Sequence, residues 1–179
     1  MGFSAPEILR YEPADDHALK DEFRLAMREL AGGVAVITVG EGKDRTGLTA
    51  TSVSSFSAEP PRLLLCINQS SSSWPALKQY GRFGVNLLAQ EQDAVADRFA
   101  GRGGIKGEAR YEGADWQTLA TGAQLLDGAL AAIDCEVEEA IIRHSHAIVI
   151  GAVKAIRLRS EASPLLYWRG GYQRLSPVS

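Results

Sequence analysis

The feature that most constrains the fold of this chain is a series of short β-branched runs separated by turns. Residues 34–39 form one such run, and residues 40–44 follow it as a turn rich in glycine and charge. Runs of this kind, bounded by turn residues, are typical of β-strands that pair in hairpins. Strands therefore dominate the prediction, at residues 34–39, 47–57, 62–68, 83–88, 129–142, 147–158, 165–168 and 172–175.

Only a few helices interrupt these strands. Phe23, Met27 and Leu30 recur at helical spacing, which predicts an early helix with one apolar face. Shorter helices are predicted at residues 74–80 and 92–99. Because strand–helix units do not repeat, a doubly wound parallel sheet is disfavoured, and a closed or split antiparallel barrel is favoured. With 179 residues, 45% of them apolar, we expect an N-terminal arm at residues 1–14 and a single domain at residues 15–179.

Composition excludes several classes of function. The formal net charge is -3, which argues against nucleic-acid binding, and no apolar run is long enough to span a membrane. The first residues show no basic segment followed by an apolar stretch, so we expect no secretory signal. Cys66 lies in an apolar run that predicts burial, and Cys135 lies between two acidic residues. Two cysteines make no disulfide framework, and both are expected to be reduced structural thiols of a cytosolic protein.

Several familiar catalytic motifs are missing. Gly40 and Gly42 follow a strand, but Arg45 stands where a dinucleotide fingerprint needs its third glycine. No serine lies in a nucleophile elbow. His144 and His146 share one face of a strand, which is a spacing that metal ligands also use, but no third ligand is evident. We therefore expect solvent-facing or structural histidines and no metal site.

Residues 47–57 do not alternate between apolar and polar side chains, as the residues of a half-buried strand should. The segment carries small residues throughout and hydroxyls on both faces. Small side chains let a flat ligand approach the backbone, and hydroxyls and amides can bond its heteroatoms. A solvent-facing strand rich in threonine explains the same residues and, for this segment alone, is favoured.

A second unusual segment follows the strand that ends at Asn68. Residues 70–73 are four serines, and a helix is predicted to begin directly after them. Hydroxyls, free amides and the helix dipole together favour a phosphate or another anion. An N-cap in a flexible serine loop is an equal alternative. Both segments in one small barrel favour the ligand interpretation.

The order of these motifs resembles the flavin reductase-like family, the reductase components of two-component flavin-dependent monooxygenases. The similarity spans residues 23–175, and no single motif carries it. The matching segments are residues 23–24, 33–38, 47–52, 57–61, 65–68, 83–88, 99–101, 126–131 and 164–172.

The resemblance implies an FMN-binding split barrel of antiparallel strands, mainly β with a few helices, that forms a homodimer. It implies that NADH or NADPH reduces FMN or FAD. The isoalloxazine ring is then expected beside Thr49, Ala50, Thr51, Ser52 and Val53. The phosphate end of the flavin is expected at Asn68, Ser71, Ser72 and Ser73, and the ring site is expected to be closed by Phe99 and Ala100.

The resemblance also assigns two residues to catalysis. His146 matches a family histidine near the nicotinamide, although His-Ser-His replaces the usual Gly-Asp-His or Gly-Thr-His. Tyr172 is expected to position the ligands, or alternatively to pack as a rim aromatic on the last hairpin. The glycine-rich loop at residues 101–107 could close over the co-substrate, but a solvated surface loop is favoured.

The function expected from this resemblance is that of a cytoplasmic NAD(P)H:flavin oxidoreductase that supplies reduced flavin to a partner monooxygenase. Two alternatives stay open. The chain could reduce another acceptor, such as a corrin-bound cobalt, through its bound flavin, or it could carry flavin without turnover.

Overall fold

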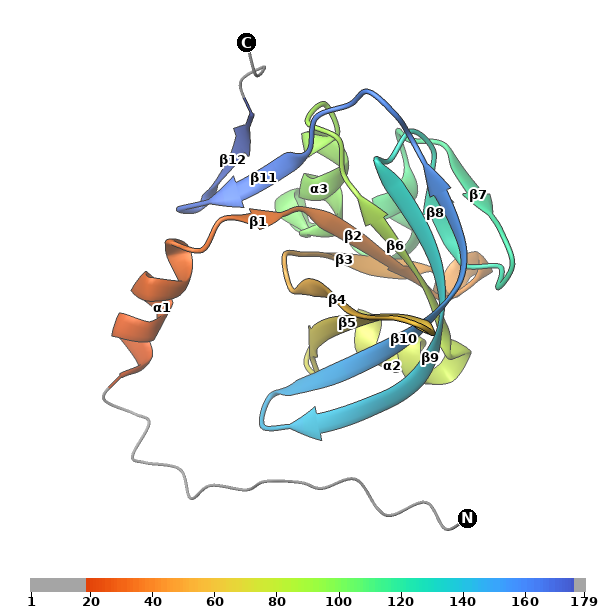
Figure 1. Cartoon of the computed structure of the whole chain (residues 1–179), viewed down its shortest axis with the longest axis horizontal. Helices are drawn as coiled ribbons and strands as arrows, with labels where there is room; N and C mark the ends of the chain where they lie inside the picture. The colour runs from red at the N-terminus through yellow and green to blue at the C-terminus, as the bar shows by residue number, and fades with distance from the viewer. Residues whose placement is uncertain (1–18, 176–179) are drawn as a thin grey trace.

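A computed structural model of the chain describes residues 19–175, and Figure 1 shows the arrangement of its elements. The helices are α1 (Lys20–Arg28), α2 (Ser73–Tyr80) and α3 (Asp93–Phe99). Short 3-10 turns cover Gly42–Asp44, Arg102–Gly104 and Gly107–Tyr111. The strands are β1 (Gly32–Gly33), β2 (Ala35–Val39), β3 (Thr46–Ala50), β4 (Val53–Ala58), β5 (Pro61–Asn68), β6 (Arg82–Leu87), β7 (Trp116–Thr118), β8 (Gln124–Leu126), β9 (Ala131–Arg143), β10 (His146–Leu158), β11 (Leu165–Trp168) and β12 (Gly171–Arg174).

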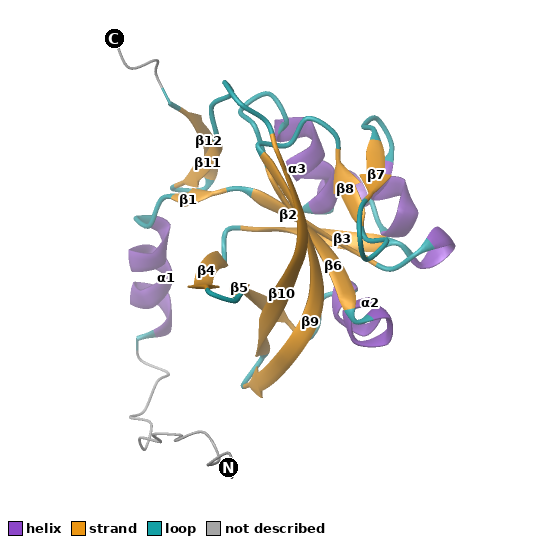
Figure 2. Ribbon diagram, turned by 45° about the vertical axis from the view of Figure 1, so that its right-hand side comes forward, coloured by secondary structure: helices purple, strands orange, loops and turns teal. Residues whose placement is uncertain are grey.

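The main sheet is antiparallel and nearly closes on itself. Its seven strands run in the order β3-β2-β6-β9-β10-β5-β4, so its two edge strands, β3 and β4, are consecutive in the chain. Only Thr51 and Ser52 separate them. The sheet therefore curls into a barrel that stays open between β3 and β4, as Figure 2 shows from the side. The predicted split antiparallel barrel is confirmed.

The predicted single strand at residues 47–57 is wrong, because the segment forms two strands. β3 pairs with β2 and β4 pairs with β5, at opposite edges of the sheet. The chain must cross the opening of the barrel between these edges, and it does so at Thr51 and Ser52. The Ser52 hydroxyl donates to the carbonyl oxygen of Cys66 at 2.9 Å, which fastens the crossing to β5.

Two cores hold the barrel, and β2 contributes to both. Ala35, Ile37 and Val39 face the first core, inside the barrel, while Val36 faces the second. This second core lies between the sheet, α3, β8 and β11. Because a strand exposes successive side chains to opposite faces, a run without alternation is what a strand buried on both faces requires. The run at residues 34–39, in which buried Thr38 is the single polar residue, therefore marks the centre of the domain.

The first helix is predicted correctly, but its apolar face is not buried. None of its residues is buried, and Phe23 and Met27 are 62% and 48% exposed. Figure 1 shows α1 standing off the barrel beside β1. In the part of the chain that the structure describes, no helix is both long and apolar enough to cross a membrane.

The two thiols differ in their surroundings. The prediction that Cys66 is buried is wrong, because β5 alternates and places Leu65 and Ile67 inside while Cys66 faces outward. Cys135 is fully buried. Burial raises the pKa of the Cys135 thiol to about 12, so this thiol stays protonated at neutral pH.

Candidate functional site

A cleft of about 250 Å³ opens where β3 ends. β3 supplies its floor, the residue after α3 supplies one side, and the hairpin of β11 and β12 supplies the other. The residues that line it are Val34, Thr49, Ala50, Thr51, Ala100, Tyr167 and Tyr172. The structure thus brings together five of the residues that the sequence predicts for a ligand site, namely Thr49, Ala50, Thr51, Ala100 and Tyr172.

The floor of the cleft is built from small side chains. Ala50 is 9% exposed, lies opposite Ala35 on β2 and belongs with it to the first core, so β3 borders the cleft with a small side chain at this position. The Thr49 hydroxyl donates to the carbonyl oxygen of Ala96 in α3 at 2.6 Å. This bond ties β3 to α3 and leaves the Thr49 oxygen able to accept a hydrogen bond from a ligand.

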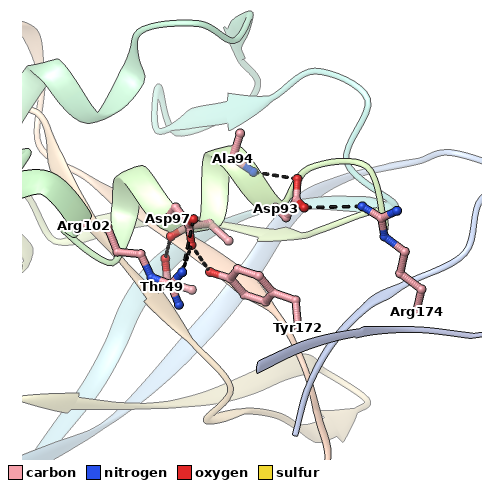
Figure 3. A network of polar contacts seen from close by, with 8 residues as sticks. Thr49, Asp93, Ala94, Asp97, Arg102, Tyr172 and Arg174 are labelled. Carbon is pink, nitrogen blue, oxygen red and sulfur yellow. Dashed lines mark hydrogen bonds and ion pairs between the residues drawn. The ribbon is translucent and has the colours of Figure 1, made fainter. Parts of the chain in front are cut away.

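Tyr172 forms a wall of the cleft and is held by two charged residues. Its hydroxyl donates to Asp97 Oδ1 at 2.7 Å, as Figure 3 shows. Arg102 lies 3.2 Å from the same carboxylate, and its guanidinium lies 5.4 Å from the centre of the Tyr172 ring. Burial, followed by the hydrogen bond to Asp97, raises the pKa of Tyr172 above its ordinary value. The phenol is therefore neutral at physiological pH.

The sequence did not single out Asp97. The residue lies in a short amphipathic helix, and its partner Tyr172 is 75 residues away along the chain. The available signal was its spacing, because Asp97 precedes Ala100 by three residues and so shares a helical face with it.

Replacing Tyr172 with phenylalanine is expected to weaken about fivefold the binding of the flavin that the sequence resemblance implies, because the wall of the cleft loses a hydrogen bond to a charged acceptor. Flavin fluorescence quenching measures the change. Tyr80→Phe is the matched control, since its hydroxyl also donates to a carboxylate, Asp44 at 2.9 Å, but lies outside the cleft. Equal effects of both variants would contradict the role assigned to Tyr172. Because the pKa of Tyr172 is raised, this residue contributes no step in affinity between about pH 6 and 9.

The serine corner, Asn68 with residues 70–73, lies apart from the cleft. Asn68 Oδ1 accepts from the backbone amide and the hydroxyl of Ser70, at 2.9 and 2.8 Å. Ser73 begins α2, is fully buried, and its hydroxyl oxygen has no hydrogen-bond partner within residues 19–175. Ser71 is half-buried and Ser72 is exposed. The corner thus contains a buried hydroxyl that has no hydrogen-bond partner among the described residues, which is rare in folded proteins.

His146 belongs to this corner and not to the cleft. It begins β10 opposite Asn68, is exposed, and has its Nδ1 2.9 Å from the Ser145 hydroxyl. Ser52 links the two groups, because it follows the cleft residue Thr51 and bonds Cys66, two residues before Asn68. The predicted site residues therefore form two groups joined along the open edge of the barrel.

Three further predicted residues do not line the cleft. Ser52 and Val53 line a neighbouring cleft of about 490 Å³ that reaches the end of α1. Phe99 is buried in the second core, where its ring centre lies 5.1 Å from that of Tyr111. Phe99 thus packs in the core next to Ala100, and only Ala100 lines the cleft. Residues 19–175 hold no group of three or more metal-ligating side chains.

Comparison with known proteins gives one consistent family. Residues 27–176 match the model of the flavin reductase like domain. The chain is 41% identical over 155 residues to FMN reductase (NADH) RutF 2 of Methylorubrum extorquens, covering 87% of this chain and 88% of that protein. It is 35% identical to the 4-hydroxyphenylacetate 3-monooxygenase reductase component of Salmonella typhi, covering 87% and 90%. The structure of nitrilotriacetate monooxygenase component B from Mycobacterium thermoresistibile superposes with a TM-score of 0.81 at 32% identity, covering 90% and 89%.

Proposed function

This chain belongs to the flavin reductase-like family, and we propose that it transfers hydride from NADH or NADPH to a flavin held in the cleft at the end of β3. The observation that carries the proposal is the cleft itself, which lies beside the small, hydroxylated residues Thr49, Ala50 and Thr51. Relatives named FMN reductase (NADH) and monooxygenase reductase component support the reaction and the class of acceptor.

The residues present fit a flavin. A planar ring needs a narrow, partly apolar space with polar atoms at one edge, and the cleft combines Ala50 and Ala100 with the Thr49 and Thr51 hydroxyls. A phosphate needs accessible donors, and the serine corner offers the half-buried Ser71 and exposed Ser72 hydroxyls at the start of α2. The neighbouring Ser73 hydroxyl is buried and has no hydrogen-bond partner within residues 19–175. In this proposal Asn68 and residues 70–73 would hold the phosphate of the flavin, and Ser52 would lie between them and the cleft.

The bound flavin supplies the hydride acceptor, so the protein needs to hold and orient the two reactants. Ala50 and Ala100 leave room for the ring, and Tyr172 with Tyr167 excludes water from one side. The Tyr167 and Tyr172 ring centres lie 5.7 Å apart, edge to face, so the two walls support each other. Amides and hydroxyls of residues 49–52 stabilise negative charge on the polar edge of the ring. Proximity is the main catalytic contribution.

The proposal extends to partners and location. Exposed apolar side chains lie on α1 and β4, and near the C-terminal ends of β9 and β10, which are at opposite ends of this strand pair. They include Phe23, Phe56, Ile142 and Ile156. Exposed apolar surface of this kind supports our proposal that two copies of the chain form a homodimer. The relative that is a monooxygenase reductase component supports delivery of reduced flavin to an oxygenase. We place this reaction in the cytoplasm.

The proposed activity is tested by following NADH and NADPH oxidation by the purified chain, with FMN, FAD and riboflavin as acceptors. We expect oxidation that depends on added flavin. Bound flavin with no NAD(P)H oxidation would instead favour a carrier without turnover. Anaerobic oxidation that requires a corrin-bound cobalt would favour a reductase of that acceptor.

We propose that His146 lies near the nicotinamide when both ligands are bound, which requires the co-substrate to cover the flavin on the side of the cleft that faces the serine corner. His146→Asn should lower the rate of hydride transfer about tenfold, or ~1.4 kcal/mol, while flavin affinity is kept. Stopped-flow reduction of FMN measures the rate, and fluorescence titration measures the affinity. His144→Asn is the matched control, because His144 is exposed with a φ of 48° that asparagine tolerates. Loss of flavin affinity in His146→Asn would refute the assigned role.

A further inference from the structure

Two consecutive residues of α3 hold opposite sides of the cleft at the end of β3. The carbonyl oxygen of Ala96 accepts from the Thr49 hydroxyl on β3, at 2.6 Å. The carboxylate of Asp97 accepts from the Tyr172 hydroxyl on β12, at 2.7 Å. Figure 3 shows Thr49 and Tyr172 approaching α3 from their two strands. The helix therefore fixes the distance between the floor of the cleft and its tyrosine wall.

The wall depends on this support because few contacts attach β12 to the barrel. β12 belongs to the small sheet β1-β11-β12, in which it pairs with β11 alone, and none of its residues is buried. Tyr172 packs at the border of the second core and binds Asp97. Arg174 lies 3.4 Å from Asp93, which precedes Asp97 by one helical turn. An edge strand with few buried contacts moves more easily than a strand inside a sheet.

The Asp97 carboxylate is the centre of the polar contacts around Tyr172. Arg102 lies 3.2 Å from this carboxylate and 5.4 Å from the centre of the Tyr172 ring. A hydrogen bond to an ionised acceptor is about twice as strong as one between neutral groups. Neither Asp97 nor Arg102 is among the described residues that line the cleft. Both residues therefore act on a ligand through Tyr172.

We propose that Asp97 is a positioning residue that sets how long the flavin stays in the cleft. The proposal rests on the proposed function, because it takes the flavin ring to lie beside Ala50 and Tyr172. While Tyr172 is bound to Asp97, the wall is fixed against α3 and encloses the ring. When this bond breaks, the wall moves outward and the flavin leaves. Reduced flavin has to leave before an oxygenase can take it up, so the strength of this bond sets the rate of delivery.

Asp97→Ala tests this role, because it removes the acceptor of the Tyr172 hydroxyl and leaves every residue that lines the cleft unchanged. Rapid dilution of the FMN complex gives the rate of flavin dissociation from the recovery of flavin fluorescence. We expect this rate to rise about tenfold, since a charged hydrogen bond is lost. Asp97→Asn keeps a carbonyl oxygen for the Tyr172 hydroxyl, so its rate should stay within about threefold of that of the unaltered chain. In Asp97→Ala the KM for FMN should rise, whereas the KM for NADH should not change.

A double variant shows whether Asp97 acts through Tyr172. Asp97→Ala combined with Tyr172→Phe should release FMN no faster than Asp97→Ala alone, because both changes remove the same hydrogen bond. Effects that multiply, to about fiftyfold, would mean that Asp97 acts independently of the wall and would overturn the proposal. Arg102→Gln is a second test that does not depend on the folding of Asp97→Ala, since the Arg102 side chain is 56% exposed. It removes the ion pair from the same carboxylate, and the rate of release should rise about threefold.

Asp93→Asn is the matched control. It removes the other ion pair between α3 and β12, while its side chain can still accept from the Ala94 amide. We expect the rate of FMN release to stay unchanged, because Arg174 is exposed and does not line the cleft.

Two results would overturn the proposal and leave the proposed function intact. The first is an active, folded Asp97→Ala protein that releases FMN at the rate of the unaltered chain. The second is an increase in Asp93→Asn as large as in Asp97→Ala, which would mean that the general attachment of β12, and not the position of Tyr172, governs release. Absence of flavin-dependent NADH or NADPH oxidation by the unaltered chain would refute the proposed function itself.

Discussion

Replacing Ala50 with leucine is expected to lower kcat/KM for flavin about a hundredfold while the protein stays folded. Ala50 lines the cleft of about 250 Å³, and a larger side chain there would occupy the space that we propose for the flavin ring. Overpacking a tight site costs about 1–3 kcal/mol, which corresponds to a loss of roughly 5- to 150-fold in affinity or rate. We expect a loss near the upper end of this range, about a hundredfold, because the cleft is small.

The matched control is Ala58→Leu, since Ala58 is an exposed residue at the end of β4 and does not line the cleft. Steady-state NADH oxidation gives kcat/KM, and thermal melting shows that both variants are folded. Full activity in a folded Ala50→Leu protein would show that the flavin does not occupy this cleft. Ala58→Leu is expected to keep the activity of the unaltered chain, because its side chain is exposed.

Gly47→Ala is expected to have the largest effect on stability, about 3 kcal/mol of unfolding free energy. Gly47 is buried on β3 opposite Thr38, three residues before Ala50. An added Cβ would overlap the backbone carbonyl oxygen of Ile37 and lie 2.5 Å from the Phe99 ring. The backbone of β2 cannot move without disturbing both cores, because β2 is fully buried. Phe99 must then shift, and Ala100, which it supports, shifts with it.

Gly33→Ala is the control for this prediction, because a Cβ at Gly33 meets nothing within 4 Å. We expect its free energy of unfolding to change by less than about 0.5 kcal/mol. Urea unfolding followed by tryptophan fluorescence gives both values. A Gly47→Ala protein as stable as the unaltered chain would contradict the close approach of β3, β2 and Phe99.

The strands were predictable from sequence where their burial depends on local pattern. The apolar run at residues 34–39 is strand β2, and the long strands β9 and β10 follow their predicted ranges closely. The crossing at Thr51 and Ser52 was not predictable, because it depends on the closure of the sheet and not on the residues of the segment. The short β7–β8 hairpin was also missed. It is held by distant partners, since buried Asp134 accepts from the amide of Thr121 at 2.8 Å.

The candidate site was predictable in its residue types but not in its arrangement. Thr49, Ala50 and Thr51 were found because small hydroxylated residues are unusual in a strand next to an apolar one. The division between the cleft and the corner of Asn68 and His146 depends on how β5 pairs with β10, which pattern alone does not reveal. The position of Asp97 in the site is not predictable from the sequence, because only the fold brings this residue to Tyr172.

A crystal structure of the chain with bound FMN tests the central claim most directly. The account predicts the flavin ring in contact with Ala50 and Ala100, between Thr49 and Tyr172, with its phosphate at the serine corner. A ring bound elsewhere, with the space above Ala50 left free, would contradict it.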